Sequence, residues 1–472
     1  MSIIIKNIGN IVREMARAYR ASVIGLAILI TLVCISIYTV IVYPYDYVVK
    51  IWNSQEVWQD NPRNALPSWI NIFLPKKLPE TIVINSSVNS NSVMKTKSFV
   101  SELGAYKIVI DFRIPYNYDD FPTGVRLSII PRYTSFYPLA SITWIKPDGT
   151  SYYIQQVKIR REFIYDISSD ESLLRNVVES IEERVGNSIG YPITLNEALF
   201  AQEDHTILSK DTIRVLKGDY RVVVEAIVFD ENDDIDAKLV IYGKVYGLAG
   251  TDHLRRDLLI PILWGTPIAL AFGLTASLCI VLFQMIYAAI SAWYGGLVDT
   301  VIQRLTEIMM VLPFLPIVMM ISYIYRITIW TLLAIIIALS MLGSGVKNYR
   351  AMFLQLKESP YIEAARAYGA GNLRIIFMYL IPRVLPTVLP SIIYSVPDFV
   401  FLEAVLALLG VGDPLAPTWG KVLEDALNNG ALYKGYYYWV LEPSALLILT
   451  SLGFALIGFA LDRIFNPRLR EM

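Results

Sequence analysis

Two acidic residues, Asp398 and Glu403, stand inside an apolar run of the chain, where a charge is unusual. An ionisable side chain in a membrane-spanning helix is costly, so such residues usually serve transport or pair with another helix. We expect Glu403 either to line a substrate path or to pack against a partner helix, and the sequence favours neither. Asp398, which follows Pro397, is a weaker candidate for the same translocation pathway.

The chain offers little support for catalysis or metal binding. It has two cysteines, Cys34 and Cys279, and two histidines, so neither a disulfide framework nor a cysteine- or histidine-based metal site is expected. It contains no Gly-x-x-x-x-Gly-Lys-Ser/Thr phosphate loop, so we expect it not to bind or cleave ATP. The segment Asp230–Ala237 begins like a calcium loop, but Ile235 and Ile241 stand where such a loop needs glycine and glutamate. A hairpin turn is the better interpretation, and we predict no cofactor, no metal and no catalytic residue.

The composition is that of a membrane protein. Of the 472 residues, 55% are hydrophobic and only 18% are charged, whereas soluble proteins carry about 25% charged residues. The net charge of -1 gives no reason to expect nucleic acid as a partner. The apolar residues are clustered in long runs, which favours contact with membrane lipid over a large soluble core.

Six apolar runs are long enough, or nearly so, to cross a bilayer at about 20 residues each. We predict spans at 21–42, 261–289, 301–323, 328–342, 385–409 and 443–461. Lys6, Arg13, Arg17 and Arg20 precede the first run against the single acid Glu14, which places the N-terminus in the cytoplasm. A cleaved signal peptide is the alternative, but the run is too long and ends without small residues. An even number of spans then puts both termini in the cytoplasm.

Residues 45–249 have a different character, with frequent mixed charges and short alternating segments typical of strands. The predicted strands are "YKIVIDFRI", "VRLSIIPRY", "LASITWIKP", "YYIQQVKI", "DYRVVVEAIVFD" and "AKLVIYGKVYG". Between them we expect a helix that is capped by Ser169 and ends at Gly186, and a second helix over 195–208. The predicted organisation is an N-terminus with one span (1–44), a mainly β extracytoplasmic domain (45–249) and a membrane core (250–472) with a cytoplasmic loop at about 347–383.

That cytoplasmic loop contains "SPYIEAARAYGAGNLRIIFMYLIPRVLP", from Ser359 to Pro386. Ser359 and Pro360 predict the start of a short helix. Small and polar residues follow, and glycines are expected to end the helix: Glu363, Ala364, Ala365, Arg366, Ala367, Gly369 and Gly371. Prolines 382, 386 and 390 are expected to break the entry to the next span. From these residues alone, the helix is either a docking knob for a partner or an ordinary interfacial helix.

The same stretch resembles the Glu-Ala-Ala motif of permease subunits in ATP-binding cassette (ABC) importers, above all their dipeptide/oligopeptide branch. Glu363, Ala364, Ala365 and Gly369 match the motif, and Pro382 stands at the right distance; Tyr379 and Ile381 depart from it. Further segments are similar to that branch: "AGTDHLRRDLL" at 249–259, "WYGGLVD" at 293–299, "EAVLALLGVGDPLAPTWG" at 403–420 and "NPRLR" at 466–470. Arg255 stands where the branch usually has glycine.

The resemblance implies a six-helix type I importer permease that forms half of a translocation pathway for peptides. It also implies a second homologous permease, two cytoplasmic ATPase subunits that grip Glu363, Ala364, Ala365, Arg366, Gly369 and Gly371, and an external solute-binding protein. The β domain between the first two spans has no counterpart in most members and resembles inserts of archaeal ones. Import of oligosaccharides is the alternative, and a membrane-anchored surface receptor or sensor is a more distant one.

Overall fold

The computed structural model describes residues 20–88, 92–102, 104–325 and 327–465. Within it the chain forms two compact units. The helical unit comprises Met1–Asn53 and Ile260–Met472, and the β unit comprises Ser54–Leu259. Lys6, Arg13, Arg17 and the "NPRLR" segment lie outside the described residues.

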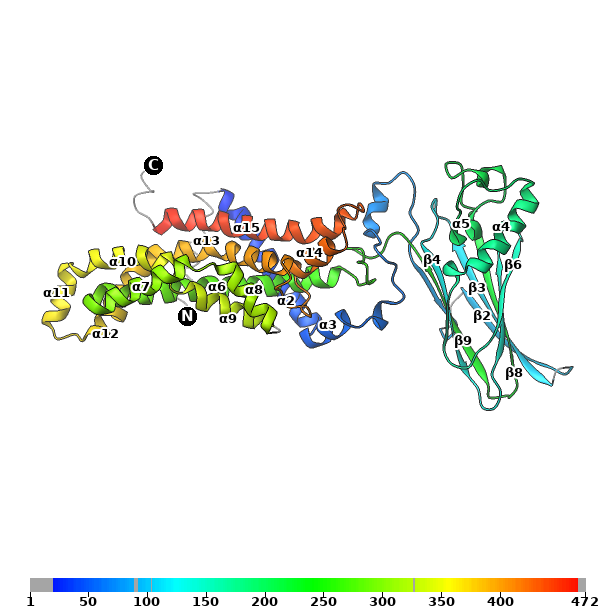
Figure 1. Ribbon diagram of the computed structural model, residues 1–472, viewed down its shortest axis with the longest axis horizontal. Coiled ribbons are helices and arrows are strands. Elements are labelled where there is room, and N and C mark those ends of the chain that lie inside the picture. Colours follow the sequence, from blue (N-terminus) through cyan, green and yellow to red (C-terminus); the bar gives the residue numbers. More distant parts are fainter. Residues whose placement is uncertain (1–19, 89–91, 103, 326, 466–472) are drawn as a thin grey trace. The chain divides into compact units, whose positions relative to one another are not determined.

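Most of the helical unit consists of long apolar helices (Figure 1). Its elements are α2 (Arg20–Val42), α3 (Tyr45–Trp52), α6 (Leu259–Tyr294), α7 (Gly296–Val311), α8 (Phe314–Ile324), α9 (Ile329–Ser340), α10 (Ser344–Lys357), α11 (Pro360–Ala367), α12 (Asn372–Arg374), a π-helical turn (Ile375–Leu380), α13 (Ile381–Leu408), α14 (Trp419–Asn428) and α15 (Tyr437–Phe465). Helix α2 packs against α15.

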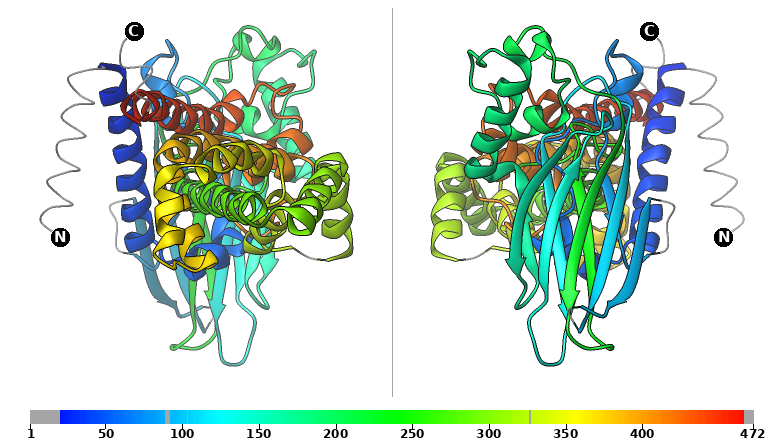
Figure 2. Two further views of the ribbon diagram at one scale, coloured as in Figure 1. Left: turned by 90° about the vertical axis from the view of Figure 1, so that its left-hand side faces the viewer. Right: turned by 90° about the vertical axis from the view of Figure 1, so that its right-hand side faces the viewer.

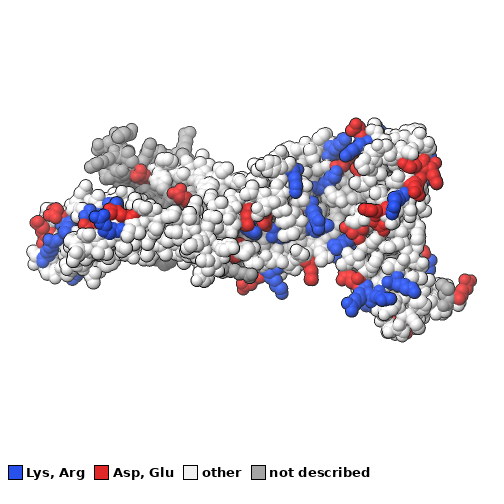
Figure 3. All heavy atoms as spheres, in the orientation of Figure 1, with Lys and Arg blue, Asp and Glu red and all other residues white. Residues whose placement is uncertain are grey.

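Four helices in the described part of the chain are long and apolar enough to cross a membrane: Ser22–Val42, Leu259–Tyr294, Asn372–Leu408 and Tyr437–Asp462. Two bent pairs raise the number to six if each counts as one span. Helices α7 and α8 meet at 77°, and α9 and α10 meet at 50°. On the face drawn in Figure 3, the charges of this unit gather near α10–α12 and near α3 and α14, with a mostly uncharged stretch between them. Such a stretch suits the interior of a bilayer.

Pro382, Pro386 and Pro390 do not break the entry to the fifth predicted span, contrary to expectation. Pro386, Pro390 and Pro397 lie inside α13, which continues from α12 as one helix through the π-helical turn. A proline leaves a carbonyl of the preceding turn without its helical donor. Hydroxyl groups bond neighbouring carbonyls: Thr387 Oγ1 donates to Val384 O at 2.7 Å, Ser391 Oγ to Val388 O at 2.6 Å and Ser277 Oγ of α6 to Ile392 O at 2.5 Å.

The β unit is built from two antiparallel sheets. Its strands are β1 (Ile82–Asn85), β2 (Val93–Val100), β3 (Ala105–Tyr116), β4 (Gly124–Arg132), β5 (Leu139–Ile145), β6 (Ser151–Lys158), β7 (Phe163–Asp166), β8 (Gly218–Val228) and β9 (Asp234–Tyr242). One sheet has the order β1-β9-β4-β7 and the other β2-β3-β8-β5-β6. Alternate apolar residues of β3, β4, β5, β6, β8 and β9 share one core. These six strands are the ones predicted from the sequence, and all six are confirmed.

Helices α4 (Glu171–Val185) and α5 (Leu195–Phe200) lie toward one end of these sheets (Figure 2). The cap of α4 is Asp170, not the predicted Ser169: its carboxylate accepts the backbone N–H groups of Ser172 and Leu173, both at 2.9 Å. Gly186 ends this helix with φ 78°, as predicted. The second predicted helix is shorter than expected. Short 3-10 helices complete the unit at Glu56–Trp58, Ser68–Ile72, Ile167–Ser169 and His205–Leu208.

Candidate functional site

Helix α11 presents one face to the protein and the other outward. Ile362, 0% exposed, and Ala365, 7% exposed, face inward, where Ile362 joins a core that includes Phe353 and Ile376. Glu363, Ala364, Arg366 and Ala367 are exposed, as is Tyr368 at the helix end. The alanines therefore lie on different faces of α11, because Ala365 belongs to the buried face. The outer face of α11 consists of small and oppositely charged side chains.

The two glycines after α11 have different roles. Gly369 has φ 78°, and its N–H donates to Arg366 O at 2.9 Å while that of Ala370 donates to Ala365 O at 3.0 Å. This bond pair is the Schellman motif, in which glycine ends a helix. Gly371 has φ -67° and precedes α12, so it begins the next helix instead of ending α11. Ser359 occupies the predicted cap position, but its side chain makes no cap hydrogen bond.

The end of α6 is bound to the segment that carries α11. The Arg366 guanidinium lies 4.5 Å from the centre of the Trp293 ring. Lys357 Nζ donates to the carbonyls of Ala292 and Trp293, each at 3.0 Å. A cation at carbonyls that end a helix also complements the helix dipole. A displacement of α11 therefore acts on α6 through a cation–π contact and two charge-assisted hydrogen bonds.

A second clamp joins α10 to α7. The Arg350 guanidinium forms a two-pronged ion pair with Asp299, with Nε at 2.7 Å from Oδ1. The hydroxyl of Ser291 on α6 donates to the same carboxylate. Since the planar guanidinium fork fixes its partner in orientation as well as distance, Asp299 holds α6, α7 and α10 together. Sequence reasoning gave no role to Asp299 and missed Trp293, Lys357 and Arg350 as residues that hold the segment carrying α11.

Glu403 and Asp398 lie apart on α13. Glu403 is 5% exposed, and its carboxyl lies at the start of α14, where a Cβ on Gly420 would be 3.2 Å from Oε2. Asp398 is exposed. Five residues of an α-helix turn through about 140° beyond a full rotation, so the two carboxylates cannot share a face. In this conformation Glu403 packs against the start of α14, and Asp398 is the one that points away from the unit's interior.

The start of α14 is also packed tightly against α6 and α13. Trp419 Nε1 donates to Ile262 O at 3.0 Å, and a Cβ on Gly265 would overlap the Trp419 ring. A Cβ on Gly420 would lie 2.7 Å from the Ala407 Cβ. Glycine is therefore required at both positions for close approach. The residues Glu403, Trp419 and Gly420, singled out from the sequence as one segment, form one corner that joins three helices.

A polar cavity of about 470 Å³ lies where both bent helix pairs break. Its lining includes Gln284 of α6, Ser340 and Gly345 beside the α9–α10 bend, Leu312 at the α7–α8 bend and Ser395 of α13. Gln284 Nε2 donates to Ser340 O at 2.8 Å, and so bonds a carbonyl at the end of α9. Sequence reasoning missed Gln284, whose only signal was an amide in the middle of a lipid-sized run.

Comparison with known proteins identifies this arrangement. Residues 284–471 match the family described as "Binding-protein-dependent transport system inner membrane component". The oligopeptide transport system permease protein OppC of Bacillus subtilis (strain 168) is 32% identical over 227 residues, which cover 47% of this chain and 72% of that protein. The dipeptide transport system permease protein DppC of the same strain is 30% identical over 226 residues, covering 47% and 69%.

The chain belongs to this permease family. It is thus a multi-pass membrane component of a transport system. The family match includes α11, the α13–α14 corner and the polar cavity, and it leaves the β unit out. The β unit is therefore a feature of this permease that the family match does not explain.

Proposed function

We propose that this permease forms half of the translocation pathway of an ABC importer for peptides. Each half would have six spans, with α7–α8 and α9–α10 each counted as one. The peptide substrate is supported by the names of the relatives, which are oligopeptide and dipeptide permeases. Oligosaccharides are the alternative cargo, and no feature of the described residues favours them.

We propose that α11 is the site at which a cytoplasmic ATPase subunit docks. The observation that carries this proposal is the outward face of α11, small and charged, on a helix that is tied to the end of α6 by the contact of Arg366 with Trp293 and, at the end of α10 just before it, by Lys357. Two ATPase subunits, one for each permease half, would supply the energy, and Glu363, Ala364, Ala365, Arg366, Gly369 and Gly371 would form the docking element. Movement of α11 would then tilt the spans and switch access to the pathway.

The assignment of sides follows from the charges. Both termini and the α10–α12 segment would be cytoplasmic, and the β unit would lie outside the cell, where it can meet an external solute-binding protein. A second homologous permease would complete the pore. Asp398, exposed on a spanning helix, would face that pathway or the partner permease, because exposure to membrane lipid would be costly. The burial of Glu403 supports a packing role for it in this conformation.

The test is uptake by the assembled importer in proteoliposomes, with labelled peptides and labelled oligosaccharides offered separately. Glu363→Lys and Gly369→Asp are expected to abolish ATP-driven uptake while the chain still inserts in the membrane. Glu358→Lys is the matched control, because Glu358 is an exposed acid just before α11. Wild-type uptake in either α11 variant would contradict the docking role, and uptake of oligosaccharides alone would contradict the peptide assignment.

A further inference from the structure

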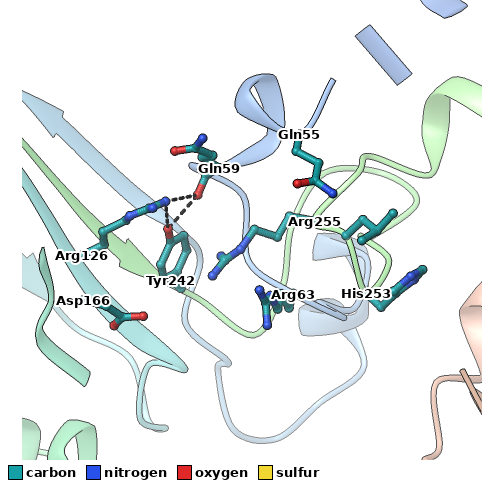
Figure 4. Close-up of a pocket in the computed structure, with 9 residues that line it drawn as sticks. Gln55, Gln59, Arg63, Arg126, Asp166, Tyr242, His253 and Arg255 are labelled. Atoms are coloured by element: carbon teal, nitrogen blue, oxygen red, sulfur yellow. Dashed lines mark hydrogen bonds between the residues drawn. The ribbon is translucent and has the colours of Figure 1, made fainter. Parts of the chain in front are cut away.

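The β unit contains a pocket with an excess of positive charge. Its volume is about 320 Å³, and Arg63, Arg126 and Arg255 line it together with Tyr242 and the acid Asp166. Figure 4 shows the three arginine side chains turned toward the same space. In the part of the chain that the structure describes, no carboxylate forms an ion pair with any of the three guanidinium groups. The pocket therefore carries a net positive charge, with three guanidinium groups against one carboxylate.

Arg255 occupies a backbone conformation that favours glycine. Its φ is 68°, in the left-handed region, which costs an ordinary L-residue about 1–2 kcal/mol. Its guanidinium lies 4.1 Å from the centre of the Tyr242 ring, and its Nη1 donates to Asn61 O at 2.5 Å. Glycine would adopt this backbone without strain. The presence of arginine at a strained position indicates that its side chain has a use.

Arg126 is held only by long hydrogen bonds. Arg126 Nη1 reaches Gln59 O and the Tyr242 hydroxyl only at 3.5 Å each, whereas that hydroxyl donates to Gln59 O at 2.7 Å. Burial lowers the pKa of Arg255, and the charges of Arg63 and Arg126 lower it further. Like charges held together in partial burial repel one another, and an anion between them would remove that repulsion.

We propose that the pocket formed by Arg63, Arg126 and Arg255 is a carboxylate-binding site. The planar guanidinium fork matches the two oxygens of a carboxylate, which makes arginine the preferred partner for this group. The ligand is the free C-terminal carboxylate of a short peptide; its being a peptide rests on the proposed function. The pocket volume is near the lower limit of small-molecule sites, about 300 Å³, so it holds the terminal residue or two and not a whole chain.

The test is isothermal titration of the full-length permease in lipid nanodiscs, without ATP or other subunits. Triglycine is expected to bind, and triglycine amide, which lacks the carboxylate, at least tenfold more weakly. Equal binding of the two, or no binding of triglycine, would overturn the proposal. Binding of acetyl-Gly-Glu-Gly amide as tight as that of triglycine would support the carboxylate site and overturn the assignment to a C-terminus. Equally tight binding of inorganic phosphate would overturn the carboxylate class.

Variants distinguish the loss of ligand binding in the pocket from the loss of folded structure. Arg255→Gly is expected to weaken triglycine binding at least tenfold with only a small shift of the thermal unfolding temperature, because the strain that glycine relieves offsets the lost contacts with Tyr242 and Asn61 O. Arg161→Gln, at an exposed arginine outside the pocket, is expected to bind like the wild type. Wild-type affinity in Arg255→Gly would overturn the proposal. Because no transport is involved, failure of the peptide uptake assay would leave this binding result intact, and the reverse also holds.

Discussion

The glycines that flank Ala370 provide a matched test of how the end of α11 is built. Space is open around both, since nothing lies within 4 Å of a Cβ placed on Gly369 or on Gly371. Their backbones differ, with φ 78° at Gly369 and -67° at Gly371. Substitution by alanine therefore introduces left-handed strain at Gly369 alone. At both positions, alanine also restricts the unfolded segment, which is worth about 0.4–1 kcal/mol in favour of the native loop.

The restriction of the unfolded segment is common to Gly369→Ala and Gly371→Ala, so it cancels when these two variants are compared. The remaining difference is the strain of a left-handed alanine, about 1–2 kcal/mol. It corresponds to a difference of about 5- to 30-fold in the equilibrium for local opening. The amides that report this opening are those of Gly369 and Ala370, which donate to the last carbonyls of α11.

Hydrogen exchange followed by mass spectrometry on the full chain in detergent measures this equilibrium directly. These amides should exchange about 5- to 30-fold faster in Gly369→Ala than in Gly371→Ala. Gly369→Asn should lie between the two, because asparagine tolerates the left-handed region better than alanine. Equal exchange in the two alanine variants, or wild-type amides that exchange as fast as an unstructured peptide, would refute the assignment of Gly369 as the residue that fixes this helix end.

Two further predictions concern packing and pH. Gly265→Ala should lower the thermal unfolding temperature, with a cost in stability of about 1–3 kcal/mol, because its Cβ would overlap the Trp419 ring. Gly190→Ala is the control, because the added Cβ meets open space there and should leave the unfolding temperature unchanged. Equal shifts in the two variants would count against this packing. Hydrogen bonds from the Tyr165 hydroxyl and from backbone N–H groups lower the pKa of Asp170. The contribution of Asp170 to the unfolding free energy is therefore complete above pH about 4 and is lost as the pH falls through the lowered pKa. The acid-induced loss of unfolding free energy should be smaller in Asp170→Asn than in the wild type, and an unchanged pH profile would contradict this prediction.

The sequence predicted the elements whose signal is local. Lipid-sized apolar runs located the four long spans, and strict alternation located six strands of the β unit. The rule that proline ends a helix failed in α13, because contacts with other elements also hold this helix, including the hydrogen bond from Ser277 of α6 to Ile392 O. The cap of α4 was misassigned by one residue for a related reason: Ser169 and Asp170 both suit the position, and only the turn geometry selects between them.

The position of the candidate site in the chain could be predicted from the sequence, but the residues that contact it could not. The composition of α11 indicated a short helix with small and charged residues, and the left-handed glycine gave its end. Which alanine faces outward depends on the core beneath the helix, which includes residues from more than one element. The partners Trp293 and Lys357 lie 73 and 9 positions before Arg366 in the sequence, and no local pattern joins them. A tryptophan at the end of an apolar run followed by two glycines was the only available signal.

The connections made by α6 and α13 suggest how a displacement of α11 travels. Helix α6 holds Arg366 and Lys357 through Trp293 at its last turn and holds Trp419 through Ile262 and Gly265 near its first. At about 1.5 Å per residue, its 36 residues would span about 54 Å.

The two helices are also locked together between their ends. The hydroxyl of Ser277 bonds Ile392 O, and Gly273 lets Val396 and Val400 approach so closely that a Cβ would lie 2.6 Å from the Val400 side chain. A pair fixed at both ends and along its length moves as one body more readily than it shears. Movement imposed at α11 should therefore be taken up at the 77° and 50° bends of α7–α8 and α9–α10. The polar cavity at those bends is then where the pathway would change shape.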